Sequence, residues 1–376
     1  MACRNNPGYQ AFIRKVLRVG LQDLKLDVIH FDQMRWPQEP FTCRCKYCQE
    51  QFRGFLRSRY QPVRARLRFG FSGFDGVIPP PYDLSSGISL RPSELRNPLM
   101  QEWARFRAWS LAQRYREYDQ YIHELNPEAA LISNPTMNLD SNIEFTWGVD
   151  LQQLLEHGDA IWSEERNLAS WTADGLVSMI RAYKAARSMG QSVFRWQPAP
   201  PPYVYEQPIE LRLSESVAYN NMNLGVVAGS DVGTNTVSPV IQRFIDFLRA
   251  HSKELKHTES IADVAVLRSF SSIEFNPAQA NVSTVLFEQS LIQSKVPFAI
   301  IFDRHLKDLS KYKVLVLANQ DALSDDQLAM IRKFVEGGGL VATENMRIKK
   351  NGLGRHRHCT SVEAWSRRAW RASNCW

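Results

Sequence analysis

The segment Leu26-Asp-Val-Ile-His-Phe-Asp32 predicts a short buried strand that ends in a carboxylate. Apolar residues recur at helical spacing between positions 12 and 24, so a helix leads into this strand. Because side chains alternate along a strand, Val28, His30 and Asp32 share one face. The chain therefore opens with a helix and a strand, and Asp32 stands at the carboxyl end of the strand.

Four more helix-and-strand pairs follow along the chain. The predicted strands are Ala129–Asn134, Ala160–Glu164, Gln191–Trp196 and Leu224–Gly229, preceded by helices 98–125, 151–157, 175–189 and 210–222. Short apolar strands between amphipathic helices predict a parallel sheet, because parallel neighbours need a crossover connection. This pattern is compatible with both a doubly wound sheet and a closed barrel.

Polar side chains at the strand ends favour the barrel. They are Asp32, Asn134, the pair Glu164 and Glu165, and Arg195-Trp196-Gln197. A (β/α)8 barrel carries function at the carboxyl ends of several strands, whereas a doubly wound sheet binds ligands at one switch point. We therefore expect an α/β fold in which residues 1–255 form the last five units of an incomplete TIM-type barrel. The other three units are expected before Met1.

A smaller, truncated α/β domain is predicted for residues 256–346. After the helix 239–255, its strands are 261–266, 298–302 and 313–317, and its helices are 284–294 and 324–336. Gly337–Gly339 would end the last helix before a further buried strand. No GxGxxG follows the first strand, so a nucleotide site is not predicted.

Charge is concentrated in the last thirty residues of this 376-residue chain, whose formal net charge is +7. Residues 347–376 carry eight Lys or Arg against one acid, Glu363, and the preceding residues balance. We expect an unstructured basic tail and no nucleic-acid partner, because a nucleic-acid footprint lies on a folded face. Without a long apolar run or a signal-peptide core, no membrane partner and a cytoplasmic location are expected.

Three of the six cysteines crowd into Cys43-Arg-Cys45-Lys-Tyr-Cys48, a spacing that suits a metal ion better than a disulfide framework. This segment, continued by Gln-Glu-Gln-Phe52, resembles the cysteine loop after the fourth barrel strand of glycoside hydrolase family 42 β-galactosidases. The segment Ala2–Tyr9 is similar to the part that supplies a fourth cysteine in that family. The resemblance implies a structural zinc site of Cys3, Cys43, Cys45 and Cys48.

The resemblance extends to Lys311–Ala318 and Leu323–Glu344. These segments are similar to the middle domain of the same family, which is flavodoxin-like and amidotransferase-like and takes part in trimerisation. The resemblance therefore implies a glycosidase that acts on a carbohydrate substrate and forms a homo-oligomer, a trimer.

Hydrolysis of a glycoside usually needs two carboxyl groups that flank the scissile bond. Asp32 is the first candidate, and a structural Asp bonded to Arg35 or to backbone is the alternative. Of Glu164 and Glu165, alternation lets only one point inward. If Trp162 packs on the helical layer, Glu165 faces the cleft, and it is therefore favoured; two solvated loop acids are the alternative.

The chain departs from family 42 at both catalytic positions. The family has Asn-Glu after its fourth strand, where this chain has Asp32-Gln33, and a nucleophilic Glu after the seventh, where Phe194–Pro198 has none. An Asp nucleophile in this place is similar to α-L-fucosidase-type barrels. We therefore expect Asp32 as nucleophile and Glu165 as acid/base in a β-galactosidase-like or α-L-fucosidase-like hydrolase. The alternative is a non-catalytic carbohydrate-binding or assembly protein.

Several side chains near the strand ends are candidates for binding a sugar. Aromatic rings stack on the apolar faces of pyranoses, while polar groups bind hydroxyls. The candidates are His30, Trp36, Asn134, Trp162, Arg195 and Trp196. For any single Trp, packing in the core is the alternative.

Overall fold

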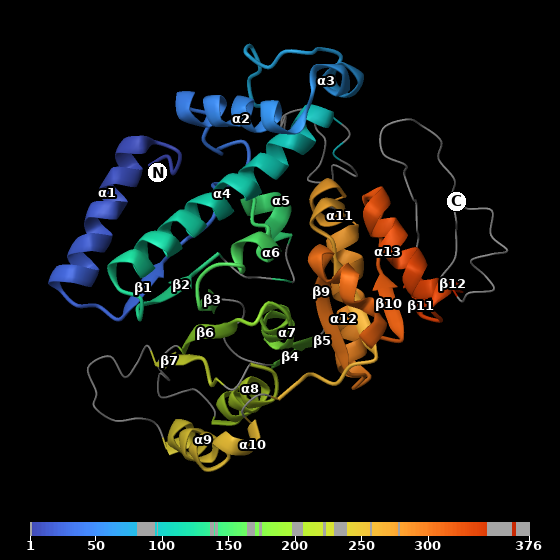
Figure 1. The fold of residues 1–376 in the computed structure, drawn as a ribbon. Helices are drawn as coiled ribbons and strands as arrows, with labels where there is room; N and C mark the ends of the chain where they lie inside the picture. Colours follow the sequence, from blue (N-terminus) through green and yellow to red (C-terminus); the bar gives the residue numbers. More distant parts are fainter. Residues whose placement is uncertain are drawn as a thin grey trace.

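The computed structural model describes residues 2–80, 95, 97–135, 139, 142–163, 170–172, 175–197, 206–220, 223–228, 239–255, 258–276, 279–343 and 363–365. In this part of the chain, helices cover two five-stranded sheets, and two short strands form a hairpin (Figure 1). None of the helices described there combines the length and the apolar character needed to cross a bilayer.

The first sheet contains five parallel strands in the order in which they occur along the chain. They are β1 (Val28–Phe31), β2 (Ala130–Ser133), β3 (Ala160–Ser163), β6 (Ser192–Gln197) and β7 (Val226–Ala228). All five predicted strands are thus confirmed. Their order does not reverse, as it would at the switch point of a doubly wound sheet, and it is the order that a segment of a (β/α) barrel requires.

Eleven helical segments are described between residues 7 and 255. They are α1 (Pro7–Arg18), the π-helix η1 (Val19–Asp23), α2 (Lys46–Arg59), α3 (Pro62–Phe69), α4 (Pro98–Leu125), α5 (Ile143–Trp147), α6 (Leu151–Leu154), α7 (Ile180–Ser188), α8 (Glu206–Tyr219), α9 (Pro239–Ala250) and α10 (Ser252–Leu255). Helix α4 has the predicted bounds because Asn97 caps Leu99 and Met100, with Pro98 at the first helical position.

The two faces of β1 have different surroundings. Ile29 and Phe31 are half-buried, and Phe31 stacks on Tyr118 of α4 with ring centroids 5.0 Å apart. Val28, His30 and Asp32 are exposed on the opposite side. The predicted alternation is therefore confirmed, and Asp32 lies on the face that the helices leave open.

One predicted helix begins later than expected. Residues 175–177 form strand β5 (Gly175–Val177), which pairs antiparallel with β4 (Ser170–Thr172), and α7 starts only at Ile180. Thr172 pairs with Gly175, so two residues separate the strands. The predicted helical spacing therefore holds only from Ile180 onward.

The second sheet has the strand order β12-β11-β10-β8-β9. Its strands are β8 (Val264–Arg268), β9 (Phe298–Phe302), β10 (Val314–Leu317), β11 (Leu340–Thr343) and β12 (Glu363–Trp365), accompanied by α11 (Phe270–Phe275), α12 (Ala280–Gln293), the 3-10 helix η2 (Asp303–Lys311) and α13 (Asp325–Glu336). Strand β9 lies on one side of β8, and β10 and β11 follow on its other side, so the strand order reverses at β8, as in a doubly wound sheet. Strand β12 is antiparallel to β11 and belongs to the basic tail, so the expectation of no regular structure is wrong for these three residues.

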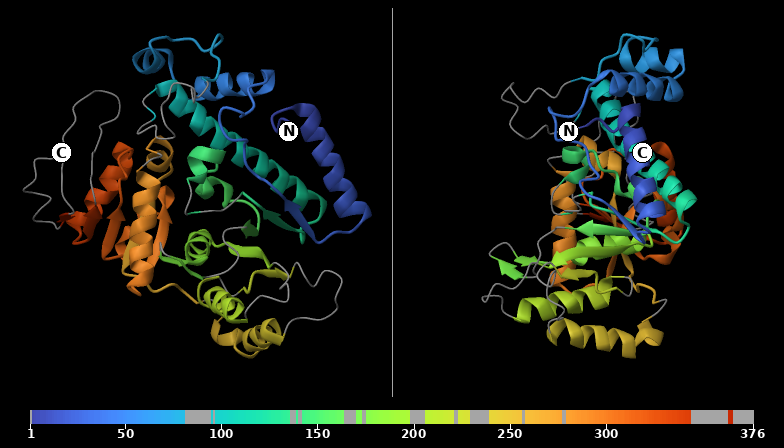
Figure 2. Two further views of the ribbon diagram at one scale, coloured as in Figure 1. Left: turned by 180° about the vertical axis from the view of Figure 1, so that it is seen from behind. Right: turned by 90° about the vertical axis from the view of Figure 1, so that its left-hand side faces the viewer.

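The two sheets are joined by buried contacts. Helix α7 packs on β9, where Lys184 Nζ donates a 2.7 Å hydrogen bond to the carbonyl of Phe298. Arg181 of α7 pairs with buried Glu288 of α12 at 3.1 Å. Figure 2 shows the second sheet on the opposite side of the molecule from α1, with α5, α6 and α7 between them. Helix α7, from the part of the chain that forms the first sheet, thus contacts the second sheet and its helix α12.

Candidate functional site

The carboxylate of Asp32 is bound to the neighbouring strand end. Asn134 Nδ2 donates a 2.9 Å hydrogen bond to Asp32 Oδ1, and the backbone N–H of Gln33 donates one of 2.8 Å to the same oxygen. Asn134 is only 1% exposed, and its backbone bonds to Phe31 and Met34 at 2.9 and 2.7 Å. The predicted pair of polar strand ends is therefore brought together, with one carboxylate oxygen held in place by two donors.

Two arginines hold the residue after Asp32. Arg4 Nη2 donates a 2.6 Å hydrogen bond to the carbonyl of Gln33, and Arg35 donates to Gln33 Oε1 from Nε and Nη2 at 3.1 and 2.7 Å. The Arg35 guanidinium lies 3.8 Å from the ring centroid of Trp147. Arg4 was not predicted to belong to the site, because no local motif marks its contact with Gln33, 29 positions away.

His30 and Trp162 lie on the same open face of the sheet as Asp32. Their ring centroids are 5.3 Å apart in an edge-to-face arrangement. The neighbours of Trp162 in β3, Ile161 and Ser163, are fully buried on the other side. The assumption that Trp162 packs on the helical layer, on which the preference for Glu165 depended, is therefore wrong. Glu164 and Glu165 themselves lie outside the described residues.

The other predicted sugar-binding residues have different positions. Trp36 is 3% exposed, and its indole N–H donates a 2.8 Å hydrogen bond to the carbonyl of Arg107. A sugar ring cannot reach it, so Trp36 is a packing residue. Arg195 pairs with Ser163 across β6 and β3, and Trp196 is the next residue of β6. The side chains of Arg195 and Trp196 lie outside the described residues.

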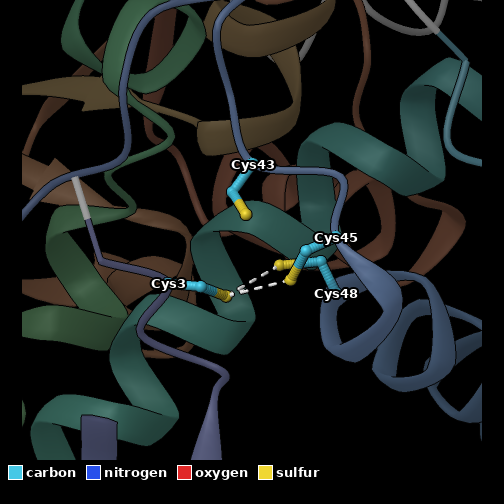
Figure 3. Close-up of side chains that lie close together, drawn as sticks. All are labelled: Cys3, Cys43, Cys45 and Cys48. Atoms are coloured by element: carbon cyan, nitrogen blue, oxygen red, sulfur yellow. Dashed lines mark hydrogen bonds between the residues drawn. The ribbon is translucent and has the colours of Figure 1, made fainter.

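The four predicted cysteines converge, as Figure 3 shows. Their sulfur atoms all lie within 4.8 Å of one another, and Cys3 Sγ is 3.4 Å from both Cys45 Sγ and Cys48 Sγ. A disulfide would bring two sulfurs to about 2.05 Å, whereas tetrahedral zinc with bonds of about 2.3 Å separates them by roughly 3.8 Å. The cluster therefore fits a structural zinc ion. It is the one such group of three or more ligands in the part of the chain that the structure describes.

The cysteine cluster connects two distant segments of the chain. Cys45 is the N-cap of α2 and Cys48 lies in its first turn, whereas Cys3 precedes α1. The hydrogen bond between Cys3 and Cys48 lowers the pKa of the Cys3 thiol to about 5 and raises the pKa of Cys48, while burial raises the pKa of Cys43 to about 11. Cys3 is thereby favoured as a thiolate, the form in which a cysteine binds a metal. A closed site of four thiolates leaves no open position for chemistry. It therefore fixes the loop that follows Asp32 onto the start of the chain.

No protein-family model and no curated protein matches the sequence. The structure is similar to β-galactosidase from Bacillus circulans sp. alkalophilus, with a TM-score of 0.67 and 16% identity over 91% of this chain and 55% of that chain. It is also similar to a catalytic mutant of a family 42 β-galactosidase from G. stearothermophilus, with a TM-score of 0.62 and 17% identity over 91% of this chain and 55% of that chain. For α-L-fucosidase isoenzyme 2 from Paenibacillus thiaminolyticus the TM-score is 0.53 and the identity 15%, over 91% of this chain and 45% of that chain.

These comparisons establish the fold. The chain spans about half the length of the solved structures that it matches. Over that span, both sheets of this chain correspond to part of the glycosidase fold, because the match covers 91% of the chain. The expected resemblance to family 42 is thereby confirmed for the fold.

Proposed function

We propose that this chain carries the catalytic face of a glycoside hydrolase, with Asp32 as the nucleophile and Glu164 or Glu165 as the acid/base. The observation that carries the proposal is the hydrogen bond between Asn134 Nδ2 and Asp32 Oδ1 at the carboxyl ends of two adjacent strands. His30 and Trp162 lie on the same face, where they can contact a sugar. The fold shared with β-galactosidases and an α-L-fucosidase supports a carbohydrate substrate.

In the proposed reaction, Asp32 attacks the anomeric carbon while the glutamic acid gives its proton to the leaving oxygen. The bond from the anomeric carbon to that oxygen breaks, and an ester to Asp32 forms. Water then attacks the anomeric carbon, its proton passes to the glutamate, and the Asp32 carboxylate leaves. Both hydrogen bonds from Gln33 and Asn134 go to Oδ1, so Oδ2 is the proposed attacking atom.

The orientation of Trp162 changes which glutamate we favour. Because side chains alternate along a strand, a residue two positions beyond Trp162 shares its face if β3 continues in extended form. In that case Glu164, and not Glu165, shares the face of Trp162 and is the proposed acid/base. Replacing each by Gln separates the two: the true acid/base loses turnover most strongly on substrates with a poor leaving group, because these need protonation.

Turnover of nitrophenyl β-galactosides and α-L-fucosides tests the proposal. Asp32→Asn removes the nucleophile and keeps the size of the side chain, so we expect a loss of about 1,000-fold or more in kcat. Asp27→Asn is the matched control, because Asp27 is exposed at the opposite end of β1. Full turnover in Asp32→Asn would refute the assignment.

A non-catalytic carbohydrate-binding protein is the second candidate. It is favoured by the end of β6, where Arg195-Trp196-Gln197 includes no carboxyl group. In that case sugars bind without turnover, and calorimetry with the same glycosides gives heat of binding that Trp162→Ala removes.

Assembly into a trimer through the second sheet belongs to the proposal as well, and light scattering of the purified chain measures it.

A further inference from the structure

Gln33 adopts a backbone conformation that needs support. Its φ angle is +53°, in the left-handed region that residues other than glycine rarely adopt. Three groups of Gln33 are bound in this conformation: the N–H by Asp32, the side-chain oxygen by Arg35 and the carbonyl by Arg4. The chain after Gln33 is anchored, because the N–H of Met34 donates a 2.7 Å hydrogen bond to the carbonyl of Asn134. A change in φ at Gln33 must therefore be balanced by a change in ψ at Asp32, which turns the peptide N–H of Gln33 away from Asp32 Oδ1.

Arg4 differs from Arg35 because it comes from another part of the chain. It follows Cys3, whose sulfur contacts Cys45 and Cys48 at 3.4 Å. The carbonyl of Arg4 accepts a 3.1 Å hydrogen bond from Gln10 of α1, and the carbonyl of Cys3 accepts one of 3.0 Å from Asn6. The backbone of Arg4 is therefore fixed by the cysteine cluster on one side and by the start of α1 on the other.

We propose that Arg4 is a positioning residue, which transmits the order of the cysteine cluster through the carbonyl of Gln33 to the carboxylate of Asp32. The contact is charge-assisted, because a guanidinium donates to the carbonyl at 2.6 Å. Without it, Gln33 relaxes towards negative φ and its N–H turns away from Asp32 Oδ1. One of the two donors that hold the carboxylate is then lost, while Asn134 remains.

The kinetic consequence rests on the proposed function, but the structural coupling does not. The full chain labelled with [15N]Gln reports the Gln33 amide directly by NMR, whether or not the chain turns over a glycoside. In Arg4→Ala we expect the Gln33 amide proton to move upfield and to exchange faster with solvent, because its bond to a carboxylate is lost. Arg4→Lys, which keeps the cation, restores part of the shift.

Arg14→Ala is the matched control. Arg14 lies on α1, the helix that follows Arg4, with its guanidinium 4.7 Å from the ring centroid of Tyr121. Replacing it removes one cation, as Arg4→Ala does. We expect it to leave the Gln33 amide unchanged. The thiolate absorption of Co²⁺ bound to the cysteine cluster shows in each variant that the cluster is intact. A Gln33 amide that does not move in Arg4→Ala with an intact cluster overturns the inference.

Chelation of the metal completes the test. Removing the metal from the wild type should shift the Gln33 amide in the same direction as Arg4→Ala does, whereas the Gln33 amide of Arg4→Ala should not respond further. Equal responses of the two proteins overturn the inference.

If the wild type turns over a glycoside, Arg4→Ala lowers kcat by about 10- to 100-fold with KM nearly unchanged. An equal loss of kcat in Arg14→Ala contradicts a positioning role of Arg4. Absence of turnover in the wild type refutes the proposed function alone, and the amide shifts then decide this inference.

Discussion

Asn134 Nδ2 lies 2.9 Å from Asp32 Oδ1 and joins the ends of strands β1 and β2 through a hydrogen bond. The two residues are 102 positions apart in the sequence. The bond is possible because Phe31 of β1 and Ser133 of β2 are register partners, so the residues after them are neighbours. The orientation of the proposed nucleophile thus depends on the pairing of the sheet.

Replacing Asn134 by Ala should lower kcat by about 10- to 100-fold, because the carboxylate of Asp32 loses a fixed donor. The variant should also unfold about 1–2 kcal/mol more easily, since a buried hydrogen bond is lost. Steady-state kinetics and urea unfolding measure the two effects. Asn126→Ala, at the C-cap of α4 before the start of β2, serves as the control. An equal loss of kcat in that variant would contradict the proposed role of Asn134.

The cysteine cluster should bind about one zinc ion per chain, and Cys48→Ser should reduce this strongly, because a tetrahedral site needs all four thiolates. Elemental analysis of the purified protein measures the metal. Cys375→Ser is the control, since the four assigned ligands are Cys3, Cys43, Cys45 and Cys48. Chelation should lower the melting temperature of the wild type and leave that of Cys48→Ser nearly unchanged. Zinc retained by Cys48→Ser would exclude the assigned ligand set.

Two buried acids between the sheets should make the stability fall as the pH rises. Glu144 of α5 and Glu274 of α11 are 3% and 0% exposed. Glu274 has no hydrogen-bond partner for either oxygen among the residues that the structure describes. Burial raises the pKa of Glu144 to about 7, although Arg268 opposes the rise, and it raises the pKa of Glu274 well above its usual value against the effect of Arg107.

Because these carboxyl groups bind protons more tightly in the folded state, their stabilisation is complete below about pH 4.5, the usual value for Glu. It is lost as the pH rises through 7, and Glu144 alone accounts for about 3 kcal/mol. Urea unfolding at pH 5 to 8 measures the slope. Glu144→Gln should flatten it, whereas Glu50→Gln, at an exposed position, should not. A slope that Glu144→Gln leaves unchanged would refute the prediction.

The chain exposes apolar side chains on α1 beside β1. Phe12 and Val16 are 58% and 49% exposed, and Val28 of the edge strand β1 is 48% exposed. Exposed apolar surface next to an unpaired strand edge favours association. We expect the purified chain to self-associate at micromolar concentration and Val16→Glu to reduce this, as light scattering would measure. A monomeric wild type would contradict this prediction.

The sequence predicts the elements of this fold better than their contacts. The strands of the first sheet and the bounds of α4 follow from apolar periodicity and from Asn97-Pro98 and Asn126-Pro127, which act locally. Helices α2 and α3 were not predicted, and strand β5 was assigned to the start of a helix. The assumed orientation of Trp162 was wrong. Alternation along a strand shows which residues share a face, but it does not show which of the two faces the helices cover.

The site was predicted in part for the same reason. Asp32 and Asn134 were identified because both follow strands of one parallel sheet, whose carboxyl ends lie along one edge. The cysteine cluster was identified through its resemblance to a known family. The contact between Arg4 and Gln33 depends on the closure of that cluster, and no periodicity carries this information.

The most direct test of the account is to trap the glycosyl-enzyme with a 2-deoxy-2-fluoro glycoside of the sugar that is turned over, and to locate the label by mass spectrometry. The account predicts one label per chain, on the peptide that contains Asp32, and none in Asp32→Asn. A label on any other residue, or turnover of the parent glycoside by Asp32→Asn at the wild-type rate, would contradict it.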